Sequence, residues 1–302
     1  MGRFDVRRRI EQLDPVRDFH EIYRLMGSLE FPWDMNQALS FALFRTYAVP
    51  SIGSLLARTG ELIERTQKRY DDTVLILDTV LEHGMTSEEG RTAIRRMNQM
   101  HRSYDISNDD LRYVLATFVV TPIRWLDAYG WRRLTGVERV ASANYYRDLG
   151  RRMGIRDMPT TWQEFSRLLD AYERDHFGFD PGGRTVAEAT LALLATFPPN
   201  DRLPVGVVRR ISFATMDDSL LDAFAFPHPS RVTRGLVRTA LKARGRVVRF
   251  LPARTEPYFG RQLPQVRSYP EGYRVAELGT FPAGCPVPHP RAADRAGAET
   301  TS

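Results

Sequence analysis

Cysteine is nearly absent from this chain, since Cys285 is the only one among 302 residues. A single cysteine excludes an internal disulfide, and the charged first residues contain no apolar run of the kind that forms a secretory signal. No stretch approaches the roughly 18–20 consecutive apolar residues that a membrane crossing needs. We therefore expect a cytoplasmic protein, and peripheral contact with a membrane surface stays open.

Several motifs that would indicate a cofactor or a nucleophile are also absent. The six histidines are scattered, with no HExxH or HxH pair, and there is no second cysteine to complete a metal-binding pair. GxGxxG and P-loop sequences are missing, which disfavours nucleotide cofactors, and no GxSxG surrounds a serine. A metal site built from several protein ligands is therefore not expected.

Lysine is scarce as well, because Lys68 and Lys242 are the only two among 43 basic residues. The net charge is +6, but arginines alternate with acidic residues through most of the chain, as on solvated helix surfaces. No uninterrupted basic arm occurs, so a nucleic-acid partner is not expected. The stretch 236–252 is basic and amphipathic. We expect a helix with a solvated basic face there, and contact with an anionic bilayer is the alternative.

What the sequence does contain is helical periodicity, in a composition with 42% hydrophobic and 26% charged residues that suits a globular core. Two short apolar segments, 205–208 and 247–251, are ambiguous, but no series of alternating strands occurs. We predict an all-α fold with a single domain over residues 1–282. Over residues 283–302 the composition shifts toward proline, alanine and glycine, which predicts a disordered tail.

Helix boundaries follow from capping residues and prolines. Asp34 is expected to cap a helix that runs to about residue 47, and Ser51 or Ser54 to begin the next one. Ser107 or Asn108 suits the cap of a long apolar helix, which is predicted to be central and buried. Pro122 is expected to kink or end that helix.

The stretch 67–104 is predicted to form two helices joined by a turn. On the second helix, His101 lies in line with Met97 on an apolar stripe. On the first, Arg69 and Thr73 are one turn apart and point the same way. An imidazole, a guanidinium and a hydroxyl on apolar helix faces are what an enclosed cofactor site requires.

Each of these residues also has a purely structural interpretation. His101 could be a hydrogen-bonded core histidine, although a single histidine is enough to hold haem iron, because the porphyrin supplies four other nitrogens. Arg69 and Thr73 could be an ordinary polar pair, with the arginine turned toward Asp72 or Glu64. The spacing alone leaves both interpretations open.

Five segments, in this order and spacing, resemble the MpaB-like oxygenases, whose catalytic domain is shared with the rubber oxygenases (latex clearing proteins). The likeness runs from about Phe31 to Pro282, and the segments that carry it are KRYDDT, AIRRMNQMH, ISNDDLRYVLATFVVTPIRW, YERDHF and SYPEGYRVAELGTFP.

The resemblance implies an all-helical, globin-like fold around haem b. It places the axial iron ligand at His101 and the pair beside the haem at Arg69 and Thr73. It also implies dioxygen as co-substrate and, as substrate, a hydrophobic small molecule with an isoprenoid double bond that is cleaved or oxidised. The alternatives from other classes are a non-catalytic helical protein that binds haem or a lipid, and a peroxidase-like activity at the same site.

Two positions depart from the rubber oxygenases. Residues 48–60 contain no carboxylate, so Glu61 is the first acidic residue before Arg69, and Asp72 stands where those enzymes have a lysine beside the threonine. Both departures favour a small isoprenoid or lipid-like molecule over polyisoprene.

Overall fold

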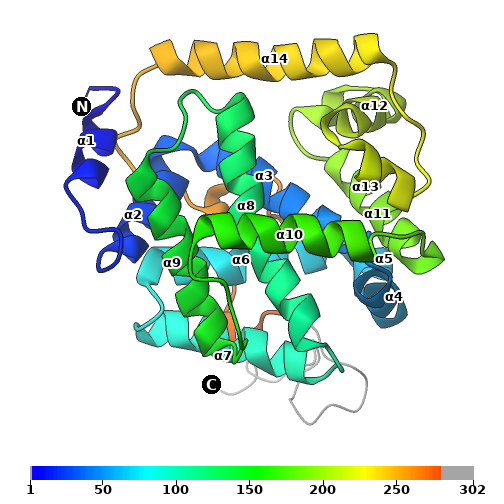
Figure 1. Cartoon of the computed structure of the whole chain (residues 1–302), viewed down its shortest axis with the longest axis horizontal. Helices are drawn as coiled ribbons and strands as arrows, with labels where there is room; N and C mark the ends of the chain where they lie inside the picture. Colours follow the sequence, from blue (N-terminus) through cyan, green and yellow to red (C-terminus); the bar gives the residue numbers. More distant parts are fainter. Residues whose placement is uncertain (1, 280–302) are drawn as a thin grey trace, which may run out of the picture.

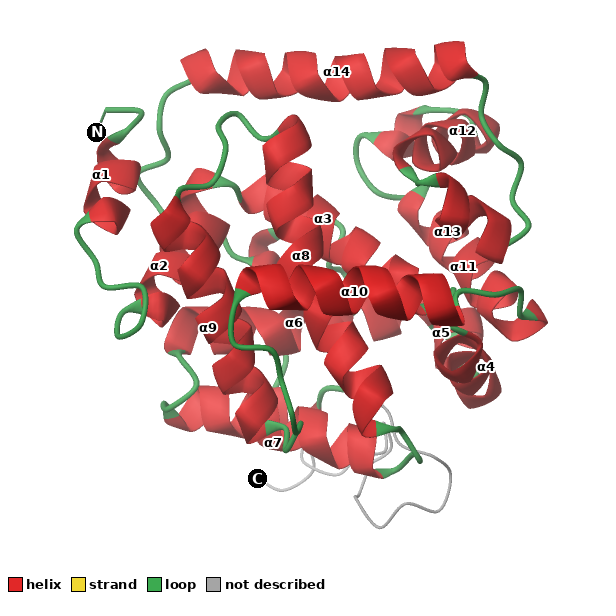
Figure 2. Ribbon diagram, viewed as in Figure 1, coloured by secondary structure: helices red, strands yellow, loops and turns green. Residues whose placement is uncertain are grey.

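The computed structural model describes residues 2–279, which form helices and loops without a strand (Figure 2). The all-α prediction is confirmed for these residues, including the two ambiguous segments, which are helical up to residue 250. The predicted tail lies outside the described residues, and the domain boundary at residue 282 stays a prediction. The α-helices are α1 (Asp5–Glu11), α2 (Phe19–Leu25), α3 (Pro32–Thr46), α4 (Pro50–Thr59), α5 (Glu61–Glu64), α6 (Thr66–His83), α7 (Glu88–Arg102), α8 (Asn108–Tyr129), α9 (Gly136–Arg152), α10 (Trp162–His176), α11 (Pro181–Leu194), α12 (Val205–Thr215), α13 (Asp218–Ala223) and α14 (Arg231–Phe250).

Helix α8 passes through the middle of the molecule, where it packs against α3, α9 and α10 (Figure 1). Ser107 caps it as predicted, because its Oγ accepts a hydrogen bond of 3.0 Å from the N–H of Asp110. The helix does not end at Pro122 but continues to Tyr129. Proline removes one helical hydrogen bond, and burial of α8 among three other helices outweighs that loss.

The predicted start of α3 is wrong by three residues, because the N-cap is Phe31 and not Asp34. The helix begins at Pro32, which places Asp34 in its first turn rather than at the cap. The Asp34 side chain is buried and accepts hydrogen bonds from the indole N–H of Trp125 at 3.1 Å and from Arg244 at 2.7 Å. The ion pair with Arg244 therefore accounts for the burial of Asp34 inside the protein. Helix α4 likewise begins at Pro50 rather than at a serine.

A buried ion triad joins the loop after α8 to the start of α9 and to Glu30, which lies 102 positions earlier in the chain than Arg132. The guanidinium of Arg132 donates to Glu30 at 2.8 Å and to Glu138 at 2.7 Å, and all three side chains are at least 92% buried. Burial raises the pKa of the Glu30 carboxyl, and the charge of Arg132 opposes that rise. The two buried carboxylates of Glu30 and Glu138 therefore share the positive charge of Arg132 inside the core.

Residues 252–279 form a segment, here named the C-terminal strap, which returns from α14 and runs along α6. Buried Asp71 accepts hydrogen bonds from the N–H of Ser268 at 2.8 Å and from the hydroxyl of the same residue at 2.6 Å. About two turns later, buried Asp78 accepts a hydrogen bond of 2.6 Å from the N–H of Gly260. The strap therefore binds α6 at two points through its own backbone.

The strap also reaches α7. Arg96, a buried residue of α7, donates a hydrogen bond from its Nε to the carbonyl oxygen of Leu278. Because the same segment is bonded to α6 and to α7, it fixes these two helices relative to each other.

Helix α14 lies along the upper edge of the molecule in Figure 1. Gly245 allows its close approach to the end of α8, because a Cβ at this position would lie 2.5 Å from the carbonyl oxygen of Tyr129. Among the described helices none is by itself long and apolar enough to cross a membrane. One bent pair, α3 with α4 at 97°, meets the length and composition criteria jointly. The cytoplasmic location stays a prediction.

Candidate functional site

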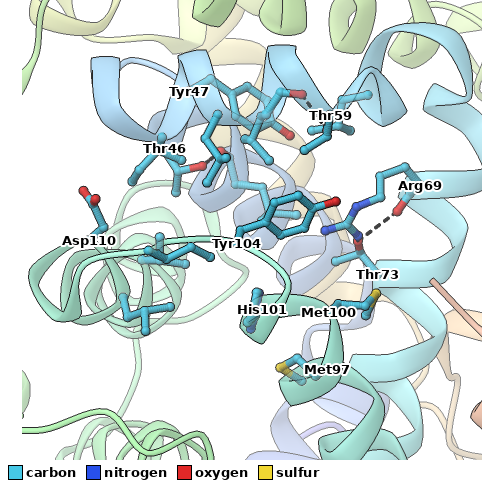
Figure 3. Close-up of a pocket in the computed structure, with 18 of the residues that line it drawn as sticks. Thr46, Tyr47, Thr59, Arg69, Thr73, Met97, Met100, His101, Tyr104 and Asp110 are labelled. Atoms are coloured by element: carbon cyan, nitrogen blue, oxygen red, sulfur yellow. Dashed lines mark hydrogen bonds between the residues drawn. The ribbon is translucent and has the colours of Figure 1, made fainter. Parts of the chain in front are cut away.

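A cavity of about 300 Å³ lies among helices α3 to α8, and its wall is mainly apolar. His101, Arg69 and Thr73, the three site residues predicted from the sequence, all line it (Figure 3). The surrounding apolar side chains include Leu55, Leu56, Ile76, Met97, Met100 and Phe118. Small-molecule sites in proteins have volumes of about 300–1,000 Å³. The cavity is therefore large enough for an organic ligand.

Arg69 and Thr73 are locked to each other on the cavity side of α6. Nη1 of Arg69 donates to the Thr73 hydroxyl at 2.5 Å, and that hydroxyl donates to the Arg69 carbonyl oxygen at 2.9 Å. The hydroxyl thus uses its proton on the backbone and a lone pair on the guanidinium. This arrangement holds the guanidinium at the cavity wall.

The alternative pairing of Arg69 with Asp72 is wrong. Asp72 is buried on the strap side of α6, where it accepts a hydrogen bond of 2.7 Å from Lys68 and another from the hydroxyl of Tyr269. One residue along a helix is a rotation of about 100°, which is enough to turn Asp72 away from the cavity while Thr73 faces it.

His101 lies in the last turn of α7 with its ring at the cavity. Its Nδ1 is buried and has no hydrogen-bond partner within residues 2–279. Burial, and then the positive charge of Arg69, lower the pKa of His101 to about 4. The imidazole is therefore neutral at neutral pH, which is the form that binds metal ions. The interpretation of His101 as a hydrogen-bonded core histidine finds no bond to support it.

We predict that His101 and His228 titrate on opposite sides of pH 6.5 in the cofactor-free protein. His228 is exposed, and its hydrogen bond of 2.7 Å to Asp222, together with the nearby Asp218, raises its pKa. Imidazole resonances, assigned with His101→Gln and His228→Gln variants, should show a midpoint well below 6.5 for His101 and one above 6.5 for His228. A midpoint for His101 at 6.5 or higher would mean that water or a counter-charge reaches the ring.

Among the other polar residues that line the cavity are Glu61, Tyr104 and Tyr47. Glu61 has an Oε2 that is buried without a partner among the described residues, while its other oxygen pairs with Arg65. Tyr104 directs its ring toward Arg69 (Figure 3). Tyr47, the residue directly after α3, is buried, which raises the pKa of its hydroxyl. Glu61 had a sequence signal in its closeness to Arg69, and Tyr104 in its closeness to His101, whereas Tyr47 enters only through tertiary packing.

A second cavity of about 120 Å³ adjoins the first. Both are lined by Thr73, and the other shared residues are Leu43, Tyr70, Leu77, Phe118 and Tyr146. Its far wall includes Tyr258 to Leu263 of the strap. The side chains that the two cavities share therefore form the wall between them, and Thr73 is one of these side chains.

The donor set fits a metal that brings most of its own ligands. No group of three or more histidine, cysteine or acidic side chains that could hold a metal ion occurs in the part of the chain that the structure describes. The cavity instead presents one imidazole with an unpartnered nitrogen, two arginines (Arg58 and Arg69) and a mainly apolar wall. A porphyrin needs one axial ligand, cationic partners for its carboxylates and an apolar pocket, and the residues present satisfy all three.

These features define a helical protein with a mainly apolar cavity suited to an organic cofactor or ligand. Residues 33–250 match the family described as the catalytic domain of ER-bound oxygenase mpaB/B' and rubber oxygenase. The chain belongs to this family, as its resemblance indicated.

Individual relatives are similar at about the same level. The chain is 31% identical over 248 residues to ER-bound oxygenase mpaB' of Penicillium brevicompactum, which covers 76% of this chain and 58% of that protein. It is 31% identical over 224 residues to ER-bound oxygenase mpaB of Penicillium roqueforti (strain FM164), an alignment that covers 68% of this chain and 74% of that protein. The chain thus spans less than two thirds of the first relative.

A solved structure shares the fold. The closed state of latex clearing protein LCP superposes with a TM-score of 0.56 over 80% of this chain and 69% of that chain, at 13% sequence identity. At this identity the likeness concerns the helical architecture.

Proposed function

We propose that this chain is a haem b-dependent oxygenase that uses dioxygen to cleave or oxidise a double bond in an isoprenoid or lipid-like small molecule. One observation carries the proposal: His101, with an unpartnered buried nitrogen, shares an apolar cavity with the Arg69–Thr73 pair. Membership of a family of named oxygenases supports the reaction class.

In this proposal His101 would hold the iron, and Arg69 would bind a haem carboxylate or the dioxygen co-substrate through charge-assisted hydrogen bonds. When bound, haem b supplies activation of dioxygen for insertion into organic substrates. Thr73 keeps the guanidinium in one orientation, so little entropy is lost when Arg69 engages its ligand. The apolar wall excludes water, and Oε2 of Glu61 is placed to accept a proton.

The second cavity gives the substrate's hydrocarbon chain a place to lie. It borders the first cavity at Thr73 and Phe118 and is lined largely by apolar side chains, among them Leu39, Val74 and Leu81. A chain that passes this wall would present a double bond next to Arg69. A flexible apolar molecule suits this shape better than a polar one, because most of the surface that lines the second cavity is apolar.

The test is oxygen uptake by haem-loaded protein with farnesol as the alkene, together with analysis of carbonyl products. Arg69→Leu should lower kcat/KM by about 100-fold, as expected when one preorganised charged donor is lost. Thr73→Val removes only the anchor of that donor, and we expect a loss of about tenfold, or 1.4 kcal/mol. Both variants should retain the haem absorption band.

Thr185→Val is the matched control, because Thr185 is on α11 and its hydroxyl bonds only within that helix, to Pro181. It should leave kcat/KM unchanged. Haem absorption with farnesol binding, but without oxygen uptake or carbonyl products, would contradict the enzyme proposal and favour the non-catalytic binder.

A further inference from the structure

Helix α14 exposes large apolar side chains along one line. Val232, Leu236, Val247 and Phe250 are 71%, 67%, 60% and 85% exposed. At 100° per residue these four positions fall within an arc of about 60° on the side of the helix that faces away from the protein. In Figure 1 no described element lies above this side of α14. The four residues are here named the apolar stripe.

This exposure is unusual within the molecule. Of the fourteen large hydrophobic side chains that are exposed in the described residues, nine lie between residues 203 and 251, on or next to α12 and α14. Single exposed apolar residues need no explanation, but a contiguous group marks an interaction surface. We therefore expect the apolar stripe to contact a partner.

The charges of α14 limit what that partner is. The helix has seven basic residues and no acidic one. Arg234 and Arg244 point inward and form ion pairs with Asp218 and Asp34. The remaining basic side chains include an exposed group beside the stripe that forms no ion pair within residues 2–279, namely Arg231, Lys242, Arg246 and Arg249. By helical angle they lie on one flank of the stripe.

We propose that α14 docks this protein on a lipid bilayer with anionic headgroups. The apolar stripe, about 30 Å long, enters the boundary between headgroups and acyl chains, while the basic flank contacts phosphate and carboxylate groups of the lipids. An apolar face bordered by lysine and arginine is the pattern of helices that lie in the membrane plane.

Charge favours the bilayer over a second copy of the chain. Two α14 helices packed stripe to stripe would bring together flanks without any acidic residue, so their basic groups would repel each other. Anionic headgroups attract the same flank. The inward face of α14 is already used by the protein, and the outer face is the one that the bilayer contacts.

Co-sedimentation with vesicles tests this docking, using the full chain with or without haem, so that its outcome is independent of the proposed enzyme activity. The protein should bind vesicles in which about a third of the lipid is phosphatidylglycerol, and bind vesicles of pure phosphatidylcholine at least about tenfold more weakly. Raising the ionic strength from about 0.1 M to 1 M, which shortens the Debye length from about 10 Å to 3 Å, should weaken binding.

Two sets of variants separate the apolar and the charged contributions. Phe250→Ser should lower the partition coefficient by about tenfold or more, because it removes an apolar side chain from the bilayer. Lys242→Gln and Arg249→Gln should each lower it by about fivefold. Phe179→Ser is the matched control, since Phe179 is 56% exposed and lies outside the stripe, and it should bind like the wild type.

Equal binding to both kinds of vesicle, or the absence of binding, would overturn the proposal. So would a dimer in sedimentation equilibrium that Leu236→Ser dissociates, because the stripe would then be a contact between two copies. All of these side chains point away from the fold, and circular dichroism with thermal melts should show that the variants remain folded.

Discussion

Replacing His101 by alanine should remove the haem absorption band from the purified protein. His101 is the one histidine lining the cavity within the described residues, so its loss leaves the proposed iron site without a protein ligand. Haem affinity should fall by more than the about 10–100-fold that losing a hydrogen-bond partner of a metal ligand costs. The absorption spectrum after titration with hemin measures this effect.

Two further variants make the result specific. His176→Ala is the matched control, because His176 is exposed at the end of α10 and bonds to the carbonyl oxygen of Tyr172 at 3.0 Å. It should bind haem as the wild type does. In His101→Gly, added imidazole should restore the band by occupying the place of the missing ring. A spectrum unchanged in His101→Ala would show that the iron ligand, if any, is another group.

Replacing Arg132 by methionine should cause the largest loss of stability among the changes considered. The substitution leaves Glu30 and Glu138 buried without their shared cation. Removing one partner of a buried ion pair costs about 3–5 kcal/mol. Urea denaturation followed by circular dichroism at pH 7 should show a free energy of unfolding lower by that amount.

The loss of unfolding free energy in Arg132→Met should become smaller as the pH falls. Burial already raises the pKa of Glu30, and removal of Arg132 takes away the charge that opposes this rise. A carboxyl group with a raised pKa in the folded state destabilises the fold as the pH increases above its unfolded value, and it is neutral in both states below that value. The difference between Arg132→Met and the wild type should therefore narrow as the pH falls from 7 toward 4.5.

Arg124→Met serves as the comparison. Arg124 pairs with Asp170 at 2.7 Å, but the two side chains are 46% and 55% exposed. Such a surface pair contributes less than about 1 kcal/mol. If Arg124→Met and Arg132→Met lost similar stability, or if the deficit grew at low pH, the neutralising role of Arg132 would be refuted.

The site residues could be selected from the sequence because helical periodicity is local. The spacing of Arg69 and Thr73, and of Met97 and His101, places each pair on one helix face wherever the helix lies. The cavity also depends on Tyr47, which directly follows α3 and whose position relative to α6 is set by packing between helices. No local pattern contains that information, and the second cavity was unpredictable for the same reason.

Other differences arise where tertiary packing outweighs a local preference. A proline interrupts the hydrogen bonds of an isolated helix, but α8 continues past Pro122 inside the core. Asp34 has the chemistry of a cap, yet it is buried and Arg244 binds it instead. An amphipathic pattern defines two faces of α14 but not which one meets the protein. Its inner face is occupied by Arg234 and Arg244 with their acidic partners, so large apolar side chains remain outside along with the expected basic ones.

The C-terminal strap has a consequence for how the protein matures. The donor that binds Asp71 is Ser268, 197 positions later in the chain, and the carbonyl oxygen that binds Arg96 belongs to Leu278, 182 positions later. Since ribosomes make a chain from its N-terminus at about 5–20 residues per second, α6 and α7 emerge well before the segment that clamps them together. The position of α6 relative to α7 is therefore fixed only after synthesis has passed Leu278, so this part of the protein completes its folding late.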